Sequence, residues 1–267
     1  MRLPARRIAP GRADAEALVS RGPFSFVGGA DPATGEILDE SSGLRGASLR
    51  GRGFAFPHGR GSTVGSYVIY GLAKRGAGPA ALLMSRADAI VAVGAVLGGI
   101  PMVDSVELGA LLTGDRVVVD ADAGHVDLPD VRATPVVTAF VRNRGRFLLV
   151  RRGDRVSAFP GKWSGISGFV EGDEDPKVRA VTEVREETGL RGLRLRAAGP
   201  TLVARHGPTA FVVHPFLFDA PSRAARLDWE NVEARWVRGA EIPDFDAVPR
   251  LADAFASVLG PPRVRKR

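Results

Sequence analysis

Apolar and polar residues alternate in short blocks along the first 128 residues, and glycines and prolines separate the blocks. The β-branched run at Val117–Val119, bounded by turn residues, is typical of a strand. Gly76 follows an apolar stretch that begins near Thr63, and glycine is favoured just past a helix end. The pattern predicts helices at Thr63–Arg75 and Ala87–Leu97, and strands at Arg2–Ile8, Phe24–Val27, Gly53–Phe56, Ala81–Met84, Ile100–Val103 and Arg116–Asp120.

The second half opens with two β-rich runs around Asn143-Arg144-Gly145, which predict a hairpin. A glycine-punctuated strand and an acidic helix follow, and the chain then returns to strands before a last helix. The predicted elements after the hairpin are a strand at Trp163–Val170, a helix at Pro176–Thr188, strands at Leu193–Arg205 and Ala210–Leu217, and a helix at about Ala247–Val258.

A polar segment with glycine and proline, Asp122–Thr134, separates these halves and predicts a domain boundary near residue 130. We therefore expect a first domain over 1–128, a linker over 129–134, a second domain over 135–260 and a basic tail over 261–267. Because strands and helices occur in both halves, the expected fold class is α/β (α+β).

Composition narrows the functional classes. The 267 residues include no cysteine, so the chain offers no thiolate for a zinc or iron–sulfur site. Arginine supplies most of the 37 basic residues, and the net charge is +7. This charge suits phosphorylated small molecules, and no nucleic-acid motif accompanies it. No apolar run is long enough to cross a membrane, and the first residues lack a signal-peptide core. We expect a cytoplasmic protein with no membrane or nucleic-acid partner.

The stretch Gly59–Gly76 places a serine among glycines directly before a predicted helix. Ser62 lies at the expected helix cap, and one interpretation is that it serves only as a cap. Alternatively, the positive end of the helix holds an oxyanion or favours a serine alkoxide, with Arg60 as a nearby cation. On this second interpretation Ser62 is catalytic, and Arg60, Gly61 and Thr63 contact the substrate.

Three longer segments, Ser25–Gly46, Gly59–Leu83 and Asp88–Asp104, closely resemble the small subunit of archaeal phosphomevalonate dehydratase, which is the swivel domain of the aconitase X family. The resemblance implies an aconitase-type swivelling β/β/α domain. It also implies a separate large subunit that carries a [4Fe–4S] cluster, while Ser62 takes a proton from the substrate. The reaction would convert mevalonate 5-phosphate into trans-anhydromevalonate 5-phosphate, a step of the archaeal mevalonate pathway to isoprenoids.

Glu183, Glu186 and Glu187 occupy i, i+3 and i+4 of the acidic helix, so they share one face. Glu174, on the preceding loop, could fold back towards that face. These residues form either a solvated acidic surface or a site for a hard divalent cation such as Mg²⁺. Spacing alone leaves both interpretations open.

The segment from Gly168 to Leu190 resembles the Nudix box, and the surrounding elements resemble a Nudix α/β/α sandwich. The matching positions are Gly168, Glu174, Glu183, Val184, Glu186, Glu187, Gly189 and Leu190. One position departs, because Thr182 stands where the family has an arginine that braces a glutamate. Arg179, one helical turn before Glu183, is a possible substitute. The resemblance implies a Mg²⁺ (or Mn²⁺) site at Glu174, Glu183, Glu186 and Glu187, with Glu186 in a catalytic role on diphosphate substrates.

Three functions remain open from the sequence. Both halves could be catalytic, the first only together with its large subunit. The Nudix half could act alone, with the first half as a docking module. The Nudix half could also be an inactive sensor of a phosphorylated metabolite.

Overall fold

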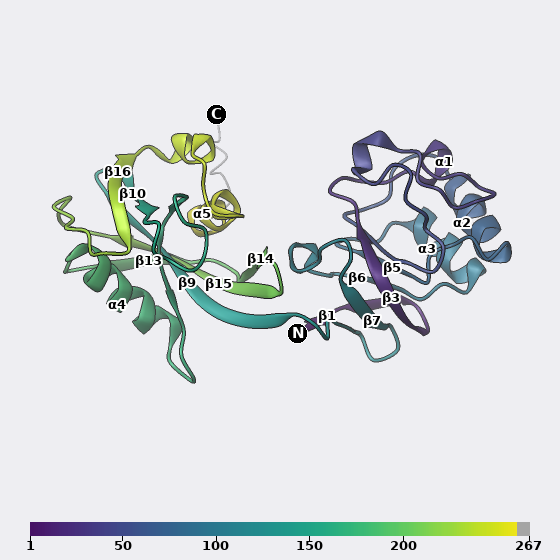
Figure 1. The fold of residues 1–267 in the computed structure, drawn as a ribbon, viewed down its shortest axis with the longest axis horizontal. Helices are drawn as coiled ribbons and strands as arrows, with labels where there is room; N and C mark the ends of the chain where they lie inside the picture. Colours follow the sequence, from purple (N-terminus) through teal and green to yellow (C-terminus); the bar gives the residue numbers. More distant parts are fainter. Residues whose placement is uncertain (261–267) are drawn as a thin grey trace, which may run out of the picture. The chain divides into compact units, whose positions relative to one another are not determined.

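The computed structural model describes residues 1–260, and the expected basic tail at 261–267 lies outside them. The chain divides into two compact units, Met1–Arg132 and the residues from Ala133 onward (Figure 1). Each unit has its own sheet and its own buried core.

The first unit is built on an eight-stranded sheet with the order β1-β8-β7-β3-β4-β5-β6-β2. Its strands are β1 (Arg2–Pro4), β2 (Arg6–Ala9), β3 (Arg12–Val19), β4 (Gly53–Phe56), β5 (Ala81–Met84), β6 (Met102–Asp104), β7 (Arg116–Asp120) and β8 (His125–Asp127). Its helical segments are α1 (Phe26–Gly29), α2 (Gly65–Lys74) and α3 (Ala89–Gly98), with 3-10 turns at η1 (Glu40–Ser42) and η2 (Leu108–Ala110).

The parallel strands β3 to β6 form the centre of this sheet, and α2 and α3 connect β4 to β5 and β5 to β6. The two helices pack against each other (Figure 1). Only Ala5 separates β1 from β2, yet these strands lie at opposite ends of the strand order. The sheet therefore curls until its two ends meet.

Several strand predictions in this unit need correction. The predicted strand Arg2–Ile8 is two strands, β1 and β2, and β8 lies in the segment that the sequence predicts as a domain boundary. β3, near the centre of the sheet, is not predicted from the sequence, because its charged residues alternate with alanines, which have low strand propensity. The predicted strand Phe24–Val27 is wrong. Phe24 makes a single bridge to Gly59, and the chain then turns through α1, where Gly28 has a φ of +75°.

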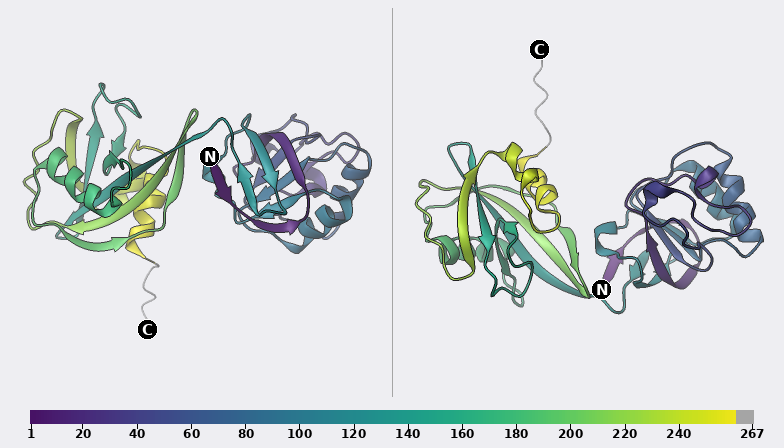
Figure 2. Two further views of the ribbon diagram at one scale, coloured as in Figure 1. Left: turned by 90° about the horizontal axis from the view of Figure 1, so that it is seen from below. Right: turned by 45° about the horizontal axis from the view of Figure 1, so that its top comes forward.

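The second unit is an antiparallel sheet with one helix on each face (Figure 2). Its strands are β9 (Arg132–Asn143), β10 (Arg146–Arg152), β11 (Trp163–Ser164), β12 (Ile166–Phe169), β13 (Arg194–Ala198), β14 (Leu202–His206), β15 (Thr209–Asp219) and β16 (Asn231–Val237). Its helices are α4 (Pro176–Thr188), α5 (Leu251–Leu259) and the 3-10 segment η3 (Gly239–Asp244). One core lies between the sheet and α4, and the other lies between the sheet and α5.

The predicted α/β class with two domains is confirmed, and α4 has the predicted bounds. β16 is missing from the prediction, and β9 begins at Arg132, inside the segment 129–134 that the sequence predicts as a linker. Within the described chain, no helix has the length and apolar character needed to cross a membrane.

Candidate functional site

The loop that carries Ser62 leaves the carboxyl end of β4 and is fixed at its base by α3. The Asp88 side chain accepts hydrogen bonds from the backbone N–H groups of Ile90 and Val91, both at 3.0 Å, and so caps α3. Its other oxygen accepts the Gly59 N–H at 2.9 Å. A Cβ at position 59 would lie 2.3 Å from that oxygen, so the close approach requires glycine. One carboxylate thus ties the loop to a helix end.

Ser62 is exposed and lies at the entrance to α2. Its Oγ accepts a hydrogen bond of 3.3 Å from the Val64 N–H, and its carbonyl accepts the Gly65 N–H at 2.9 Å. Ser62 therefore closes the turn before α2, which begins at Gly65 rather than at the predicted Thr63. Thr63 is also exposed, and its carbonyl accepts the hydroxyl of the buried Ser66 at 2.8 Å. The capping interpretation and the oxyanion interpretation both fit this geometry.

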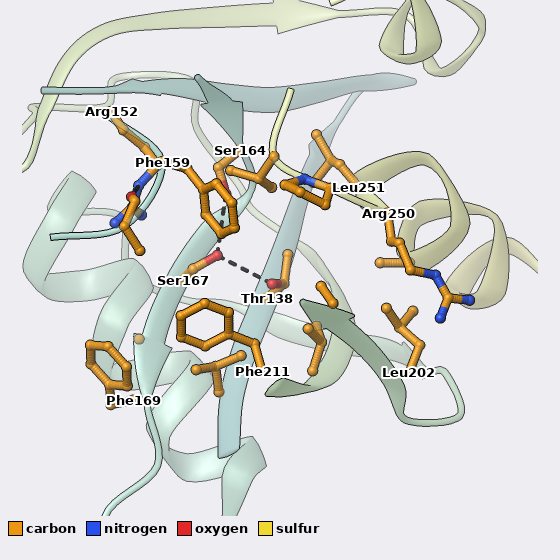
Figure 3. Close-up of a pocket in the computed structure, with 18 residues that line it drawn as sticks. Thr138, Arg152, Phe159, Ser164, Ser167, Phe169, Leu202, Phe211, Arg250 and Leu251 are labelled. Carbon is orange, nitrogen blue, oxygen red and sulfur yellow. Dashed lines mark hydrogen bonds between the residues drawn. The ribbon is translucent and has the colours of Figure 1, made fainter. Parts of the chain in front are cut away.

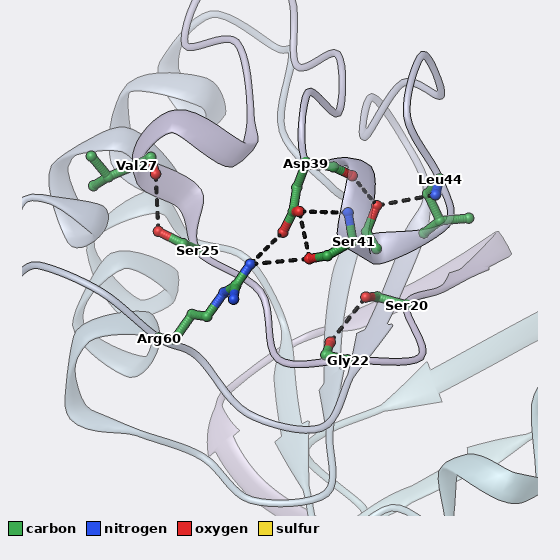
Figure 4. Close-up of polar contacts among 9 residues, drawn as sticks. Ser20, Gly22, Ser25, Val27, Asp39, Ser41, Leu44 and Arg60 are labelled. Carbon is green, nitrogen blue, oxygen red and sulfur yellow. Dashed lines mark hydrogen bonds and ion pairs between the residues drawn. The ribbon is translucent and has the colours of Figure 1, made fainter.

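The guanidinium of Arg60 turns towards η1. It donates to Asp39 Oδ2 at 2.9 Å and to Ser41 Oγ at 3.1 Å (Figure 4). Hydrogen bonds from Ser41, together with the charge of Arg60, hold the pKa of Asp39 below its usual value. Gly61 has a φ of +105°, and a Cβ there would lie 2.8 Å from Ser25 Oγ. The structure thus gathers these predicted substrate-contacting residues into one polar, solvent-facing loop cluster.

Large apolar side chains surround this loop on the surface. Val27 is 41% exposed, Val64 is 52% exposed and Tyr67 is 72% exposed. Val27 and Gly65 lie close together, because a Cβ at position 65 would contact the Val27 side chain at 3.9 Å. We call Val27, Val64 and Tyr67 the apolar rim. Apolar groups gathered beside a polar site are typical of a surface that a partner covers.

The second candidate site is on α4, whose ends follow directly from its sequence. The Asp175 side chain accepts the Lys177 N–H at 2.8 Å and caps the helix, and Pro176 occupies its first turn. Gly189 ends the helix in a left-handed conformation with a φ of +67°. These signals fix where α4 begins and ends, and its buried residues, among them Ala180, Glu183, Val184 and Glu187, form the inner face that points towards the sheet.

Glu183 is buried on that inner face, with its carboxyl group against Gly168. A Cβ at position 168 would fall 1.7 Å from Glu183 Oε1, so only glycine leaves room for the carboxylate. The guanidinium of Arg179 pairs with Glu183 one helical turn away. Burial raises the pKa of Glu183, and the charge of Arg179 opposes that rise. Arg179 therefore makes the contact that its spacing predicts, beside Thr182.

Glu187 is the most buried acid of the site, with 4% of its surface exposed. Its two oxygens accept hydrogen bonds from Asn231 Nδ2 at 2.6 Å and from the Ser167 N–H at 3.3 Å. Burial, with added repulsion from Glu183 and Glu230, raises the pKa of Glu187 to about 8. Sequence reasoning missed Asn231 and Ser167, because neither lies within the helix pattern.

The other acids differ in position. Glu186 is exposed and Glu174 is half-buried on the turn before α4. Glu230, directly before β16, is close enough to raise the pKa of Glu183 and Glu187. Glu233, on β16 itself, instead accepts a hydrogen bond from Arg235 at 2.7 Å. Glu230 therefore belongs to the acidic cluster.

This cluster fits a hard divalent cation by its donor chemistry, since every donor is a carboxylate oxygen. Two of the carboxylates are buried beside like charges, an arrangement that a cation would stabilise. Among residues 1–260, no three His, Cys, Asp or Glu side chains are yet close enough to hold an ion together. The side chains that now contact Arg179 and Asn231 would have to rotate to bind one.

The comparisons with known proteins cover both units. The aconitase X swivel domain model matches residues 2–128, and the NUDIX domain model matches residues 132–258. The phosphomevalonate dehydratase small subunit of Thermococcus gammatolerans is 48% identical over 130 residues, which cover 49% of this chain and 99% of that protein.

Two solved structures are similar to one unit each. Aconitase X of Thermococcus kodakaraensis in its holo-form is 49% identical and covers 48% of this chain and 98% of its own, with a TM-score of 0.47. A MutT protein from Methanosarcina mazei is 27% identical and covers 47% of this chain and 91% of its own, with a TM-score of 0.42. Both family resemblances expected from the sequence are confirmed by the domain matches. Through its first unit the chain belongs to the aconitase X swivel family of phosphomevalonate dehydratase small subunits, and its second unit is a NUDIX domain.

Proposed function

We propose that the first unit is the small subunit of a dehydratase that removes water from mevalonate 5-phosphate to give trans-anhydromevalonate 5-phosphate. The observation that carries this proposal is the exposed Ser62 at the entrance to α2. The match to a small-subunit relative, 99% of which is covered, supports it. The chain has no cysteine, so a thiolate-held [4Fe–4S] cluster belongs to the large subunit. There it would act as the Lewis acid for the leaving hydroxyl group.

Ser62 is the residue that takes the proton from carbon. Its Oγ already accepts the Val64 N–H, and the N-terminal end of α2 adds a positive potential, so both favour the alkoxide. These effects are strong only where water is excluded. Because Ser62 is exposed in this chain, the large subunit must cover the loop before the serine becomes a strong base.

The apolar rim supports such a partner, since Val27, Val64 and Tyr67 expose large apolar groups beside Ser62. Arg60, Gly61 and Thr63 would then face the substrate across the covered surface. The test is the dehydration rate of the complex co-expressed with its large subunit. Ser62→Ala should abolish dehydration while the buried-hydroxyl control Ser66→Ala retains it. Equal rates for the two variants would rule out Ser62 as the base.

We also propose that the second unit is a Mg²⁺-dependent hydrolase of small diphosphates. The carboxylates of α4, two of them buried beside like charges, support this role. Glu174, Glu183, Glu186 and Glu187 would hold Mg²⁺ or Mn²⁺, which would neutralise the diphosphate charge. Glu186 is exposed and has no hydrogen-bond partner within residues 1–260, which supports a role in accepting a proton from water.

Phosphate release from a panel of diphosphates measures this activity. It should require Mg²⁺ and should vanish in Glu186→Gln, whereas Glu233→Gln, outside the acidic cluster, should leave it intact. Absence of release from every diphosphate tested would contradict the hydrolase proposal and favour a sensor.

A further inference from the structure

An apolar cavity of about 90 Å³ opens on the sheet face that α5 covers, opposite to α4. Three phenylalanines, Phe159, Phe169 and Phe211, lie around it (Figure 3). Phe211 lies between the other two, with ring centroids 6.0 Å from Phe159 and 6.5 Å from Phe169. Aliphatic side chains from β14, β15 and α5 complete its walls.

The polar groups of the cavity are few and mostly engaged with one another. The Ser167 hydroxyl lies 3.2 Å from the Thr138 hydroxyl and 3.3 Å from the Ser164 hydroxyl. Among the described lining residues there is no Asn, Gln, Asp or Glu. A nucleobase buried here would leave much of its hydrogen-bonding edge unsatisfied, which costs about 1–3 kcal/mol per group. The lining therefore favours an apolar group.

The volume of the cavity also favours an apolar ligand group. An apolar cavity of about 150 Å³ accommodates a benzene ring, and this cavity measures about 90 Å³. A branched chain of about five carbons is close to benzene in size, whereas a purine base and a ten-carbon chain are clearly larger. The volume of the cavity therefore favours a short apolar group over either of these.

Strand β12 connects the cavity with the acidic cluster. It pairs with β9 along one edge, and at its other edge the Ser167 N–H donates to Glu187. The Ser167 hydroxyl points into the cavity (Figure 3), while the next residue, Gly168, contacts Glu183. A ligand whose apolar end lies in the cavity could extend its charged end past this edge to the glutamates.

The same cavity has a cation in its lining. Arg152 lines the cavity, and its Nε donates to the Ala158 carbonyl at 2.9 Å. Its terminal NH₂ groups make no hydrogen bond to the described residues, so they are available to phosphate oxygens.

We propose that the substrate of the second unit is the diphosphate ester of a short, branched, apolar alcohol of about five carbons. This inference rests on the proposed hydrolase function and adds the substrate class. Water adds to one phosphorus, the bridging P–O bond breaks, and the products are the alkyl monophosphate and inorganic phosphate. The proton released by water passes to a glutamate carboxylate and then to solvent.

The experiment compares three probes with the full-length protein and Mg²⁺: 3-methylbut-2-enyl diphosphate, its ten-carbon homologue geranyl diphosphate, and ADP. Phosphate release gives kcat/KM, and binding to the Glu186→Gln protein is measured separately by isothermal titration. We expect the five-carbon probe to exceed both others by about tenfold or more, because only its apolar group fits and is buried in the cavity.

Filling the cavity tests its role. Ala204→Leu places a larger side chain in the cavity wall, and it should raise KM for the five-carbon probe by about tenfold with little change in kcat. Ala234→Leu is the matched control, since Ala234 is exposed on β16 outside the cavity. Phe211→Ala is a second cavity variant if Ala204→Leu does not fold, and it should also raise KM.

The outcomes separate this inference from the hydrolase proposal. Preference for ADP, or a KM unaffected by both cavity variants, would overturn the substrate class and leave the hydrolase standing. Tight binding of the five-carbon probe without hydrolysis by the wild type would overturn the hydrolase and retain the ligand class. Neither binding nor hydrolysis of that probe would overturn the inference.

Discussion

At the scale of single residues, a contact in α4 accounts for a departure from the Nudix pattern. Thr182 stands where the pattern has arginine, and Arg179 reaches Glu183 from one turn earlier. A cation thus contacts a glutamate of this motif from another position of the helix. The spacing of Arg179 predicts this contact, but the burial of Glu183 against Gly168 depends on β12 and is visible only in the fold.

We predict that Arg179→Ala lowers kcat for diphosphate hydrolysis by about 10- to 100-fold, since partners that orient a metal ligand have effects of this size. The double variant Arg179→Ala/Thr182→Arg should recover part of the loss, because it restores a cation beside Glu183. Titration with Mg²⁺ provides the second readout, and the single variant should need more metal. Unchanged kcat and unchanged metal dependence would show that the ion pair does not position Glu183.

Glu187 gives a prediction about pH and stability in the absence of metal. Its folded-state pKa of about 8 lies above the ordinary value of 4.5, so the folded state holds the proton more tightly than the unfolded state. Its contribution to stability is therefore full below pH 4.5 and is lost as the pH rises through 8, with a slope of up to about 1.4 kcal/mol per pH unit. Glu187→Gln should remove this slope and be more stable than wild type at pH 8.

Urea unfolding in EDTA at pH 5, 6.5 and 8 measures this effect. Tryptophan fluorescence reports on the second unit, because Trp163, Trp229 and Trp236 are all in it. The exposed Glu186→Gln serves as the control and should keep the wild-type slope. A Glu187→Gln protein whose pH dependence matches the wild type would contradict the assignment.

At the scale of elements, the sequence best predicts the helices and strands whose ends carry capping or helix-ending residues. The predicted bounds of α4 are correct, and in the structure Asp175 caps its first turn and Gly189 ends it. β3 escaped prediction because alanines occupy the positions between its charges, and its neighbours stabilise it instead. For example, Arg12 of β3 forms an ion pair of 2.7 Å with Asp120 of the neighbouring strand β7. The contacts of Glu187 with β12 and β16 could not be predicted either, because they join segments that are far apart in the sequence.

The edge pairing of β2 with β6 should be sensitive to acid. Arg6 donates two hydrogen bonds to the buried Asp104, at 2.7 and 2.8 Å, and they hold the pKa of Asp104 below its ordinary value of 3.8. This stabilisation is present above pH 3.8 and is lost as the pH falls through the lower folded-state pKa. Asp104→Asn should lower the free energy of unfolding by about 1–3 kcal/mol at neutral pH.

Hydrogen exchange of peptides from β2 and β6 measures this edge. Exchange should accelerate in the wild type as the pH falls below 3.8, after correction for the intrinsic rate, and it should already be fast at pH 7 in Asp104→Asn. Exposed Asp122→Asn is the control. Protection of β2 in Asp104→Asn equal to that of the wild type would contradict this role.

At the scale of the whole molecule, the two proposed activities belong to separate units, and the apolar rim is the proposed contact with a second protein. Tyr67→Asp should weaken the complex with the large subunit by about tenfold or more, since a charge would be buried in an apolar contact. Val178→Asp, on an exposed position of α4, should not change the complex. The two variants are compared with the wild type by co-purification with the large subunit and by titration of that subunit.

Tyr67→Asp should leave diphosphate hydrolysis unchanged, because it lies in the other unit. Full affinity of the Tyr67→Asp protein for the large subunit would show that the rim is not the interface.

Ser62 as the base is the central claim, and proton exchange at the substrate carbon tests it most directly. The complex with the large subunit is incubated with mevalonate 5-phosphate in D₂O, and the recovered substrate is analysed for deuterium by mass spectrometry. We predict that the wild-type and Ser66→Ala complexes incorporate deuterium at that carbon, and that Ser62→Ala binds the substrate but does not. Deuterium incorporation by Ser62→Ala at the wild-type rate would contradict the claim.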